Sequence, residues 1–344
     1  MMPVRLARLL TVAAAVFVFL AAVAAPSATA GVPDSSSRSS GLTGDLDTHD
    51  PALVAGGPGQ NWYVFSTGDA SVGGGTIQIR SSPNGHDWAF AGTVWDSIPS
   101  WIKKEIPGVN NLWAPEIYHY RGTYYLYYVA SKFGTNDSVI ALATNTTLDP
   151  HSAAYKWVDQ GQVLRSVPSD DYNALDPAII EDGRGRPYMA FGSYWSGIRM
   201  LPLDWPSGHV AANAGEPLRL ASRQDPPYAI EAPYIVHRAG WYYLFTSWDA
   251  CCRGVDSTYR IVIGRSRLVT GPYLDRDGKS LLDGGGSTFL ATSGNQVGPG
   301  GESVSDGILA YHYYDRAQGG KPHLALQQLS WSADGWPEIS DARQ

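Results

Sequence analysis

Four carboxylates stand beside prolines in phrases that resemble one another. Asp50 and Asp176 each precede a proline directly, Glu231 lies two residues before one, and Glu116 follows one. If a fold brings such side chains together, burial and mutual repulsion separate their pKa values, so that one group holds a proton while another stays ionised. A pair of carboxyl groups tuned in this way can hydrolyse a glycosidic bond by general acid–base chemistry.

The neighbours of these residues suggest how the roles divide. Glu231 lies beside Ile230 and near Tyr234, and burial among apolar groups raises a carboxyl pKa, as a general acid requires. Asp50 follows a histidine and other acidic residues, and this polar setting favours the ionised form that a general base needs. Asp176 could then hold the acid in position and tune it by like-charge repulsion, while Glu116 has a supporting role through hydrogen bonds to the backbone.

A repeat of about 60 residues explains why these carboxylates should meet. The phrases "HDPALV", "WAPEIY", "LDPAII" and "EAPYIV" are each followed by a Gly-rich turn or short polar turn and an aromatic strand such as "GTYYLYYVAS" or "GWYYLFTSW", and "SVSDGILAYHYYD" is a fifth, degenerate copy. Repeats of this length with about four strands each predict an all-β fold, a five-bladed β-propeller, in preference to a pair of β-sandwiches. The best helical candidate is the short phrase "SWIKKEI".

In a propeller the innermost strand of each blade lines the central channel. The acidic phrases open the repeats, so we expect their carboxylates to converge at one end of that channel. The chain also carries 12 Trp and 20 Tyr, whose flat faces can stack on sugar rings or fill the core.

Composition limits the partners and the location. The 344 residues carry a net charge of -7 without a basic tract, so nucleic acid is not an expected partner. Residues 1–30 combine arginines, an apolar run and a final "ATA", which predicts a secretory signal peptide, with an uncleaved anchor as the alternative. Residues 31–41 read as a flexible spacer, and residues 42–344 as a single catalytic domain. We therefore expect a secreted, extracellular monomer with no membrane contact after cleavage of the signal.

The two cysteines, Cys251 and Cys252, are adjacent in the chain. A disulfide between neighbours closes almost no loop and adds little stability. The sequence leaves open whether they form such a bond or remain two free thiols.

The chain resembles glycoside hydrolase family 43 and, more narrowly, its endo-α-1,5-L-arabinanases. The matching phrases extend over most of residues 44–315 and are "THDPALV", "NLWAPEIY", "NALDPAII", "SYWSGI", "IEAPYI", "CCRG" and "YHYYD". The resemblance implies that Asp50 is the base that activates water, Glu231 the general acid and Asp176 the residue that orients the acid and raises its pKa. It also implies inversion at the anomeric carbon, with arabinan and arabino-oligosaccharides as substrates.

Further residues take expected roles from the same resemblance. The segments that match the lining of the sugar subsites contain Trp113, Phe133, Gly134, Asn173, Ala174, Leu175, Ser193, Tyr194 and Trp195. His312 matches a histidine beside a bound ion, often calcium; the chemistry itself requires no cofactor. Because calcium prefers oxygen ligands, waters would have to complete its shell. One departure is Gly301, where we expect a histidine in relatives after "GPG", and it puts the lining of the fifth blade in doubt.

Two alternatives to an endo-acting arabinanase follow. The first is an exo-acting α-L-arabinofuranosidase or β-xylosidase of the same family, which would need a groove closed at one end. The second is a non-catalytic carbohydrate-binding propeller, which would not require Asp50, Asp176 and Glu231 together.

Overall fold

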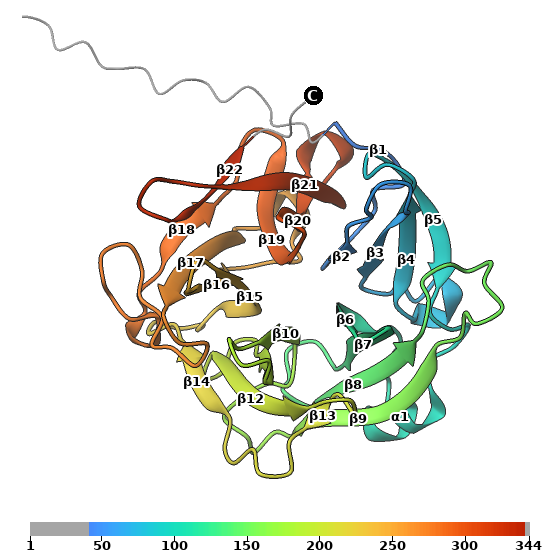
Figure 1. Cartoon of the computed structure of the whole chain (residues 1–344), viewed down its shortest axis with the longest axis horizontal. Helices are drawn as coiled ribbons and strands as arrows, with labels where there is room; N and C mark the ends of the chain where they lie inside the picture. The colour runs from blue at the N-terminus through green and yellow to red at the C-terminus, as the bar shows by residue number, and fades with distance from the viewer. Residues whose placement is uncertain (1–40, 341–344) are drawn as a thin grey trace, which may run out of the picture. The chain divides into compact units, whose positions relative to one another are not determined.

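The computed structural model describes residues 41–340, and these fold into five small sheets arranged around a central axis (Figure 1). The predicted five-bladed β-propeller is confirmed. The expected signal peptide and most of the spacer lie outside the described residues. Within residues 41–340 no helix is long and apolar enough to cross a membrane.

Each blade is a mainly antiparallel sheet with its first long strand nearest the axis. The first blade contains β1 (Thr43–Gly44), β2 (Ala52–Val54), β3 (Trp62–Ser66), β4 (Gln78–Ser82) and β5 (Asp87–Thr93). The second contains β6 (Trp113–Tyr120), β7 (Thr123–Ala130), β8 (Ser138–Asn145) and β9 (Val158–Ser166). The third contains β10 (Ala178–Glu181), β11 (Pro187–Phe191), β12 (Ile198–Asp204), β13 (His209–Val210) and β14 (Leu218–Ala221).

The last two blades have four strands each. The fourth contains β15 (Ile230–Arg238), β16 (Trp241–Trp248), β17 (Arg260–Ser266) and β18 (Ser287–Leu290). The fifth contains β19 (Gln296–Ser305), β20 (Ile308–Asp315), β21 (Lys321–Trp331) and β22 (Pro337–Ser340). The aromatic runs predicted as strands are β3, β7, β11 and β16, and each pairs with the strand that precedes it.

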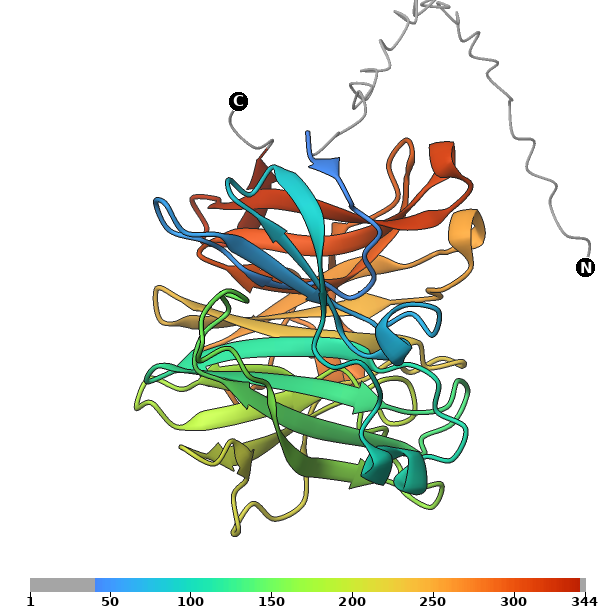
Figure 2. The ribbon, with the colours of Figure 1, turned by 90° about the vertical axis from the view of Figure 1, so that its right-hand side faces the viewer.

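Short helical segments lie in the loops between strands, and α1 (Ser100–Glu105) is the one among the described residues that connects two blades. The expected helix is confirmed as α1, and the 3-10 turns are η1 (Gly73–Gly75), η2 (Gly254–Asp256), η3 (Leu281–Asp283) and η4 (Arg316–Gln318). Figure 2 shows α1, η1, η2 and η4 on the same side of the ring. The loop before η2 carries Cys251 and Cys252, which are joined by a disulfide.

Alternation along the strands builds the core between neighbouring blades, because successive side chains of a strand point to opposite faces of its sheet. In β7, Leu126 and Tyr128 pack with residues of the first blade, whereas Tyr125 and Tyr127 pack with residues of the third. Further clusters fill the remaining interfaces, and one of them joins the first blade to the fifth. Near that junction the backbone N–H of Leu324 donates to the carbonyl of Leu46, so the ring is closed by contacts between chain-distant segments.

Candidate active site

The five blades share one backbone feature near the centre of the ring. Each has a residue with positive φ just before its innermost strand or within it: Asp50 (52°), Ala114 (36°), Asp176 (54°), Ala232 (49°) and Gly301 (61°). In β6, β15 and β19 the pairing register shifts at this point, as at a β-bulge. Unfavourable backbone conformations of this kind concentrate at functional sites, where they aim side chains.

These residues and their successors surround an axial cavity of about 30 Å³, room for about one water molecule. In four blades the successor is proline: Pro51, Pro115, Pro177 and Pro233. In the fifth blade it is Glu302, so the degenerate repeat carries a carboxyl group where the other four carry a proline ring. The axis is therefore lined by Asp50, Glu116, Asp176 and Glu302.

Asp50 is held as an ionised carboxylate. Its Oδ2 accepts hydrogen bonds from Thr67 Oγ1 at 2.7 Å and from His49 Nδ1 at 2.8 Å. Burial alone would raise the pKa of Asp50, but His49, His312 and the Thr67 hydroxyl hold it well below its usual value. Because Oδ2 has two donors, Oδ1 is the oxygen left to face a reacting group.

Glu231 lies across the axis from Asp50, in the fourth blade. Its Oε2 accepts a hydrogen bond from Ser193 Oγ at 2.6 Å, and its Oε1 accepts one from Tyr259 Oη at 2.8 Å. Burial raises the pKa of Glu231, and the negative charge of Asp50 adds to the rise against the opposing effect of the two hydroxyls. The structure thus separates the two carboxyl groups into one that is ionised and one that favours its proton.

Asp176 stands next to Glu231 in the adjacent blade. Its Oδ2 accepts a hydrogen bond from the backbone N–H of Ala232 at 2.9 Å. Burial raises the pKa of Asp176, and the charges of Glu231 and Asp50 raise it further. Because the charge of each buried carboxyl group disfavours ionisation of the other, the two groups do not both ionise easily. Asp176 and Glu231 therefore titrate as a pair that retains a proton.

Glu116 and Glu302 are buried more deeply, at 3% and 5% exposure. Glu116 Oε1 accepts a hydrogen bond from the backbone N–H of Ile179, which links the second blade to the third. Burial raises the pKa of Glu116 to about 8 and that of Glu302 also to about 8. Both side chains therefore contribute neutral acids to the axis at acidic pH.

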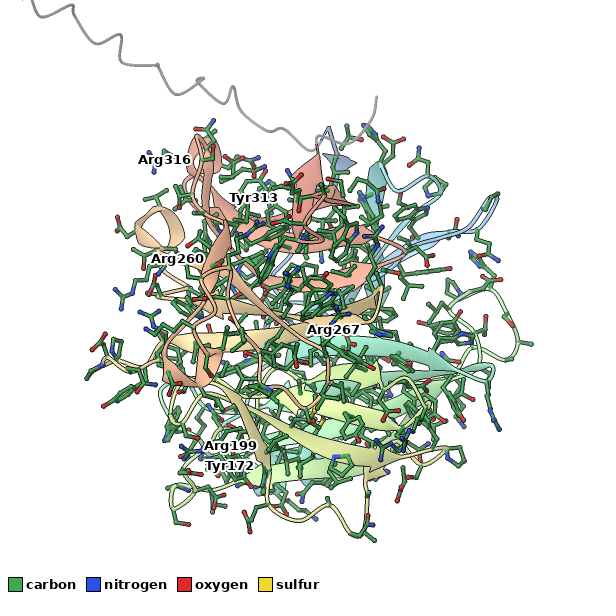
Figure 3. The ribbon with its side chains drawn as sticks, turned by 60° about the vertical axis from the view of Figure 1, so that its left-hand side comes forward. Tyr172, Arg199, Arg260, Arg267, Tyr313 and Arg316 are labelled. Atoms are coloured by element: carbon green, nitrogen blue, oxygen red, sulfur yellow. A yellow bond between two sulfur atoms is a disulfide. The ribbon has the colours of Figure 1, made fainter. Side chains whose placement is uncertain are left out.

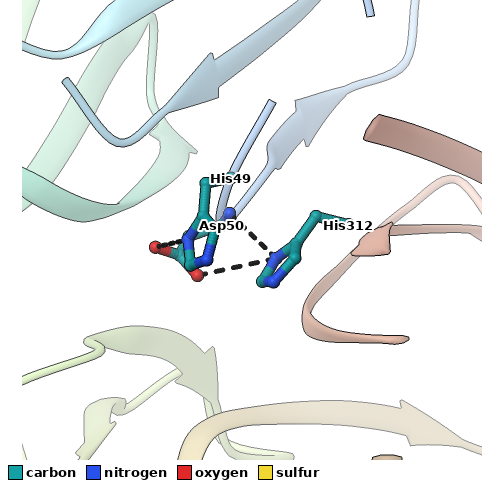
Figure 4. A group of neighbouring side chains, drawn as sticks. All are labelled: His49, Asp50 and His312. Atoms are coloured by element: carbon teal, nitrogen blue, oxygen red, sulfur yellow. Dashed lines mark hydrogen bonds and ion pairs between the residues drawn. The ribbon is translucent and has the colours of Figure 1, made fainter. Parts of the chain in front are cut away.

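His312 packs beside Asp50 (Figure 4). The backbone N–H of Asp50 donates to its Nδ1 at 3.2 Å, and its buried Nε2 has no hydrogen-bond partner among the described residues. His49, Asp50 and His312 also form a group whose potential ligand atoms lie within 4.8 Å of one another. Because Nδ1 accepts this hydrogen bond, the neutral ring carries its proton on Nε2, where it can be donated to water. For Nε2 to bind a cation, the proton would have to move to Nδ1, 3.7 Å from Asp50 Oδ1, with loss of the hydrogen bond from the Asp50 backbone.

The departure at Gly301 has a steric reason. A Cβ atom at this position would lie 2.7 Å from Asp50 Oδ1 and 2.8 Å from His312 Nδ1, and φ is +61°. Only glycine fits this backbone without moving Asp50 or His312. The open space in front of Asp50 Oδ1 therefore depends on the missing side chain.

The expected sugar-contact residues fall into two groups, and the first is accessible. Phe133 is 83% exposed with Gly134 beside it, Trp195 is 37% exposed, and Trp113 and Tyr194 are half-buried. Ser193 is buried and is bound to Glu231.

A cavity of about 640 Å³ opens beside His49 and Thr67, and the partly exposed ring of Phe90 contributes to its wall. This volume is in the range of small-ligand sites.

The second group is built into the wall between the second and third blades. The side chains of Ala174 and Leu175 belong to the hydrophobic core. The amide of Asn173 is also buried; its oxygen accepts from Ser138 Oγ at 2.6 Å. Just before this segment, Asp171 accepts a hydrogen bond from Arg199 of β12 at 2.6 Å. The guanidinium of Arg199 also lies 5.6 Å from the ring centre of Tyr172, and Figure 3 labels these two residues side by side. This segment is therefore held in place by contacts within the protein.

Several site residues were not singled out from the sequence. Tyr259 and Thr67 donate directly to the two central carboxylates, and Tyr314 and Glu302 lie just behind them. The register of the fifth repeat could have identified Glu302, because "GGES" aligns with the phrases that contain proline. The other hydroxyl donors carry no comparable pattern in the sequence.

Comparison with known proteins agrees with this architecture. The model of the family described as "Glycosyl hydrolases family 43" matches residues 43–337. The chain belongs to family 43 of the glycosyl hydrolases. It is 40% identical over 291 residues to the extracellular endo-α-(1→5)-L-arabinanase 1 of Bacillus subtilis, covering 84% of this chain and 86% of the relative.

Both modes of action occur among the relatives of this family 43 chain. The extracellular exo-α-(1→5)-L-arabinofuranosidase ArbA of Cellvibrio japonicus is 39% identical over 313 residues, covering 86% of this chain and 87% of the relative. Among solved structures, the family 43 endo-arabinanase from Bacillus licheniformis superposes with a TM-score of 0.80 at 38% identity, covering 86% of this chain and 99% of that one. The chain is therefore a glycoside hydrolase.

Proposed function

We propose that this protein cleaves internal α-1,5-L-arabinofuranosidic bonds of arabinan with inversion at the anomeric carbon. The observation that carries the proposal is the opposite tuning of Asp50 and Glu231 across one axis, the first held ionised and the second favouring its proton. The names of the relatives supply the substrate, since they include endo-arabinanases and an α-L-arabinanase solved with arabinohexaose.

In the proposed reaction Asp50 accepts a proton from a water molecule as that water attacks the anomeric carbon. The bond from this carbon to the leaving oxygen breaks, and Glu231 gives its proton to that oxygen. Ser193 and Tyr259 keep the Glu231 carboxyl in one orientation through their hydroxyl groups. Asp176 keeps the proton on the pair that it forms with Glu231 until the leaving group takes it.

Inversion requires space for a water molecule between the base and the sugar, which separates the two carboxyl groups by about 6.5–9.5 Å. Asp50 and Glu231 belong to blades that are not neighbours in the ring, as Figure 1 shows for β2 and β15. The Gly301 position, where a Cβ would lie against Asp50 Oδ1, leaves room for that water. These features support single displacement over a covalent intermediate.

The substrate is proposed to lie across the mouth of the channel, with its rings near the exposed faces of Phe133 and Trp195. A second candidate is exo action, because the Cellvibrio japonicus relative is named an exo-enzyme. The length distribution of the products from linear arabinan distinguishes the two. Mixed oligosaccharides at early times support endo action, and a single short product released from the start supports exo action.

The proposal includes secretion. Residues 1–30 are proposed as a cleaved signal peptide, residues 31–41 as a spacer and residues 42–344 as the catalytic domain of an extracellular monomer. The extracellular relatives support this location. We also propose a structural calcium ion near His312, with waters completing its shell, where it would supply positive charge beside the carboxylates, while the proton transfers remain with the protein.

Purified Asp50→Ala and Glu231→Ala variants test the proposal on debranched arabinan. Each removes one half of the proton transfer, so kcat should fall by about 10²–10⁴-fold. Asp204→Asn, at an exposed position of β12, is a matched control and should retain activity. Normal activity in either alanine variant, with the fold intact by circular dichroism, would remove the assignment.

A further inference from the structure

Asp50 is oriented by His49, and His49 is itself held by a hydrogen bond on the other side of its ring. The ring of His49 lies flat against that of His312, with centroids 3.8 Å apart, and its Nδ1 is the atom that meets Asp50 Oδ2 (Figure 4). An ionised carboxylate only accepts hydrogen bonds, so Nδ1 of His49 must carry a proton. In the neutral ring Nε2 then has a free lone pair and needs a donor.

Tyr314 supplies that donor. Its Oη lies 2.8 Å from His49 Nε2 and also accepts a hydrogen bond from the backbone N–H of Cys252 at 2.8 Å. A phenol has two acceptor lone pairs and one proton. With the Cys252 N–H on one lone pair, the phenol proton remains to be donated to the neutral ring of His49.

The result is one directed row of hydrogen bonds across three chain segments. It starts in the loop that holds the Cys251–Cys252 disulfide, passes through Tyr314 on β20 and His49, and ends on the carboxylate of Asp50. Tyr314 is only 3% exposed, and its ring is edge-on to that of His312. A phenylalanine ring would fill the same space. Packing therefore accounts for an aromatic ring at position 314 but not for its hydroxyl group.

We propose that Tyr314 is a positioning residue for the base. It fixes the ring orientation and the tautomer of His49, so that Nδ1–H stays on Asp50 Oδ2 and Asp50 Oδ1 stays directed at the attacking water. Without the hydroxyl group the imidazole can rotate or move its proton to Nε2, and Asp50 then loses one of its two donors. This role rests on the proposed function of Asp50, because it acts through that residue.

Kinetics of Tyr314→Phe on a short linear arabino-oligosaccharide give the first test. Partners that orient a reacting group are commonly worth about 10–100-fold in activity, so kcat should fall by that factor. KM should change by less than about twofold, since Tyr314 acts on the base and not on sugar binding. Tyr313→Phe makes the same chemical change at the next position of β20, on the opposite face of the strand, and should behave as the wild type.

The tautomer itself gives the second test and does not depend on activity. In protein labelled with ¹⁵N-histidine, at a pH where His49 is neutral, its Nδ1 should show the protonated shift and its Nε2 the unprotonated one. The signal is assigned by its loss in His49→Asn. In Tyr314→Phe the two shifts should move toward each other as the ring samples both tautomers; unchanged shifts would overturn the proposal.

The two tests separate this inference from the proposed function. If Asp50→Ala is inactive while Tyr314→Phe keeps full kcat, the positioning role fails and the catalytic assignment stands. An equal loss of kcat in Tyr313→Phe would also overturn the positioning role, because the effect would then follow from packing of β20. If the wild type cleaves no arabino-oligosaccharide, the proposed function fails, and the ¹⁵N shifts still decide whether Tyr314 fixes His49.

Discussion

Glu302→Gln should change how the stability of the protein depends on pH. Glu302 is buried on the axis, where its Oε2 accepts a hydrogen bond from Ser247 Oγ at 2.7 Å and its Oε1 has no partner among the described residues. Burial raises the pKa of Glu302 from 4.5 to about 8, and the charges of Asp50 and Glu231 add to this. Glutamine keeps the size of the side chain and removes the proton equilibrium.

The direction of the pH effect on stability follows from the pKa of Glu302 in the unfolded chain and in the folded protein. The folded protein binds the Glu302 proton more tightly than the unfolded chain, so the stabilising contribution is complete below pH 4.5 and is lost as the pH rises to about 8. One pKa unit corresponds to about 1.36 kcal/mol, so this interval corresponds to about 5 kcal/mol. The Glu302→Gln variant has no proton to lose at this position. Its free energy of unfolding, compared with that of the wild type, should therefore rise with pH.

Denaturant unfolding of both proteins at pH 4.5, 6 and 8 measures this difference. The matched control is Glu105→Gln, an exposed residue at the end of α1, which should leave the difference from wild type unchanged with pH. A constant difference between Glu302→Gln and the wild type across this range would refute the reasoning. It would mean that Glu302 is ionised in the folded protein.

Three further substitutions test other parts of the site. Asp176→Asn removes the carboxyl group that shares a proton with Glu231, so the alkaline limb of the kcat/KM profile should move to lower pH; an unmoved limb would exclude that coupling. Gly301→Ala places a Cβ 2.7 Å from Asp50 Oδ1, so kcat should fall and denaturant unfolding should show a loss of about 1–3 kcal/mol; wild-type values would contradict the steric account. Phe133→Ala alters a residue that is 83% exposed, so stability should stay within about 0.5 kcal/mol while KM for oligosaccharides rises; an unchanged KM would exclude it as a sugar contact.

Much of the fold could be predicted because its cause is local. A strand that packs on both faces needs apolar residues on both, and β7 with its run of tyrosines and aliphatics shows that pattern directly. The residue before each proline takes a positive φ near the start of an inner strand, so the repeated phrases located the ring of blades and the convergence of Asp50 and Asp176. The fifth blade was harder to predict because Gly301 and Glu302 replace the proline phrase there.

The parts that could not be predicted depend on contacts between distant segments. Tyr259 lies 28 positions from Glu231, and Tyr314 lies 265 positions from His49, so no spacing rule connects them. Tyrosine is also abundant in the core, and nothing in the sequence separates a buried ring from one whose hydroxyl group holds a reacting carboxyl. The sequence also left open whether Cys251 and Cys252 form a disulfide or remain two thiols, because adjacency does not decide their redox state, whereas the structure contains the disulfide.

The central claim is that Asp50 and Glu231 hydrolyse arabinan by a single displacement. Proton NMR of linear arabino-oligosaccharide, recorded from the moment the enzyme is added, tests it most directly. The first product should carry the β-configuration at its new reducing end and convert to the α-form only later, by mutarotation. Initial appearance of the α-anomer would contradict the account, because it would require a covalent intermediate formed on one of the carboxylates.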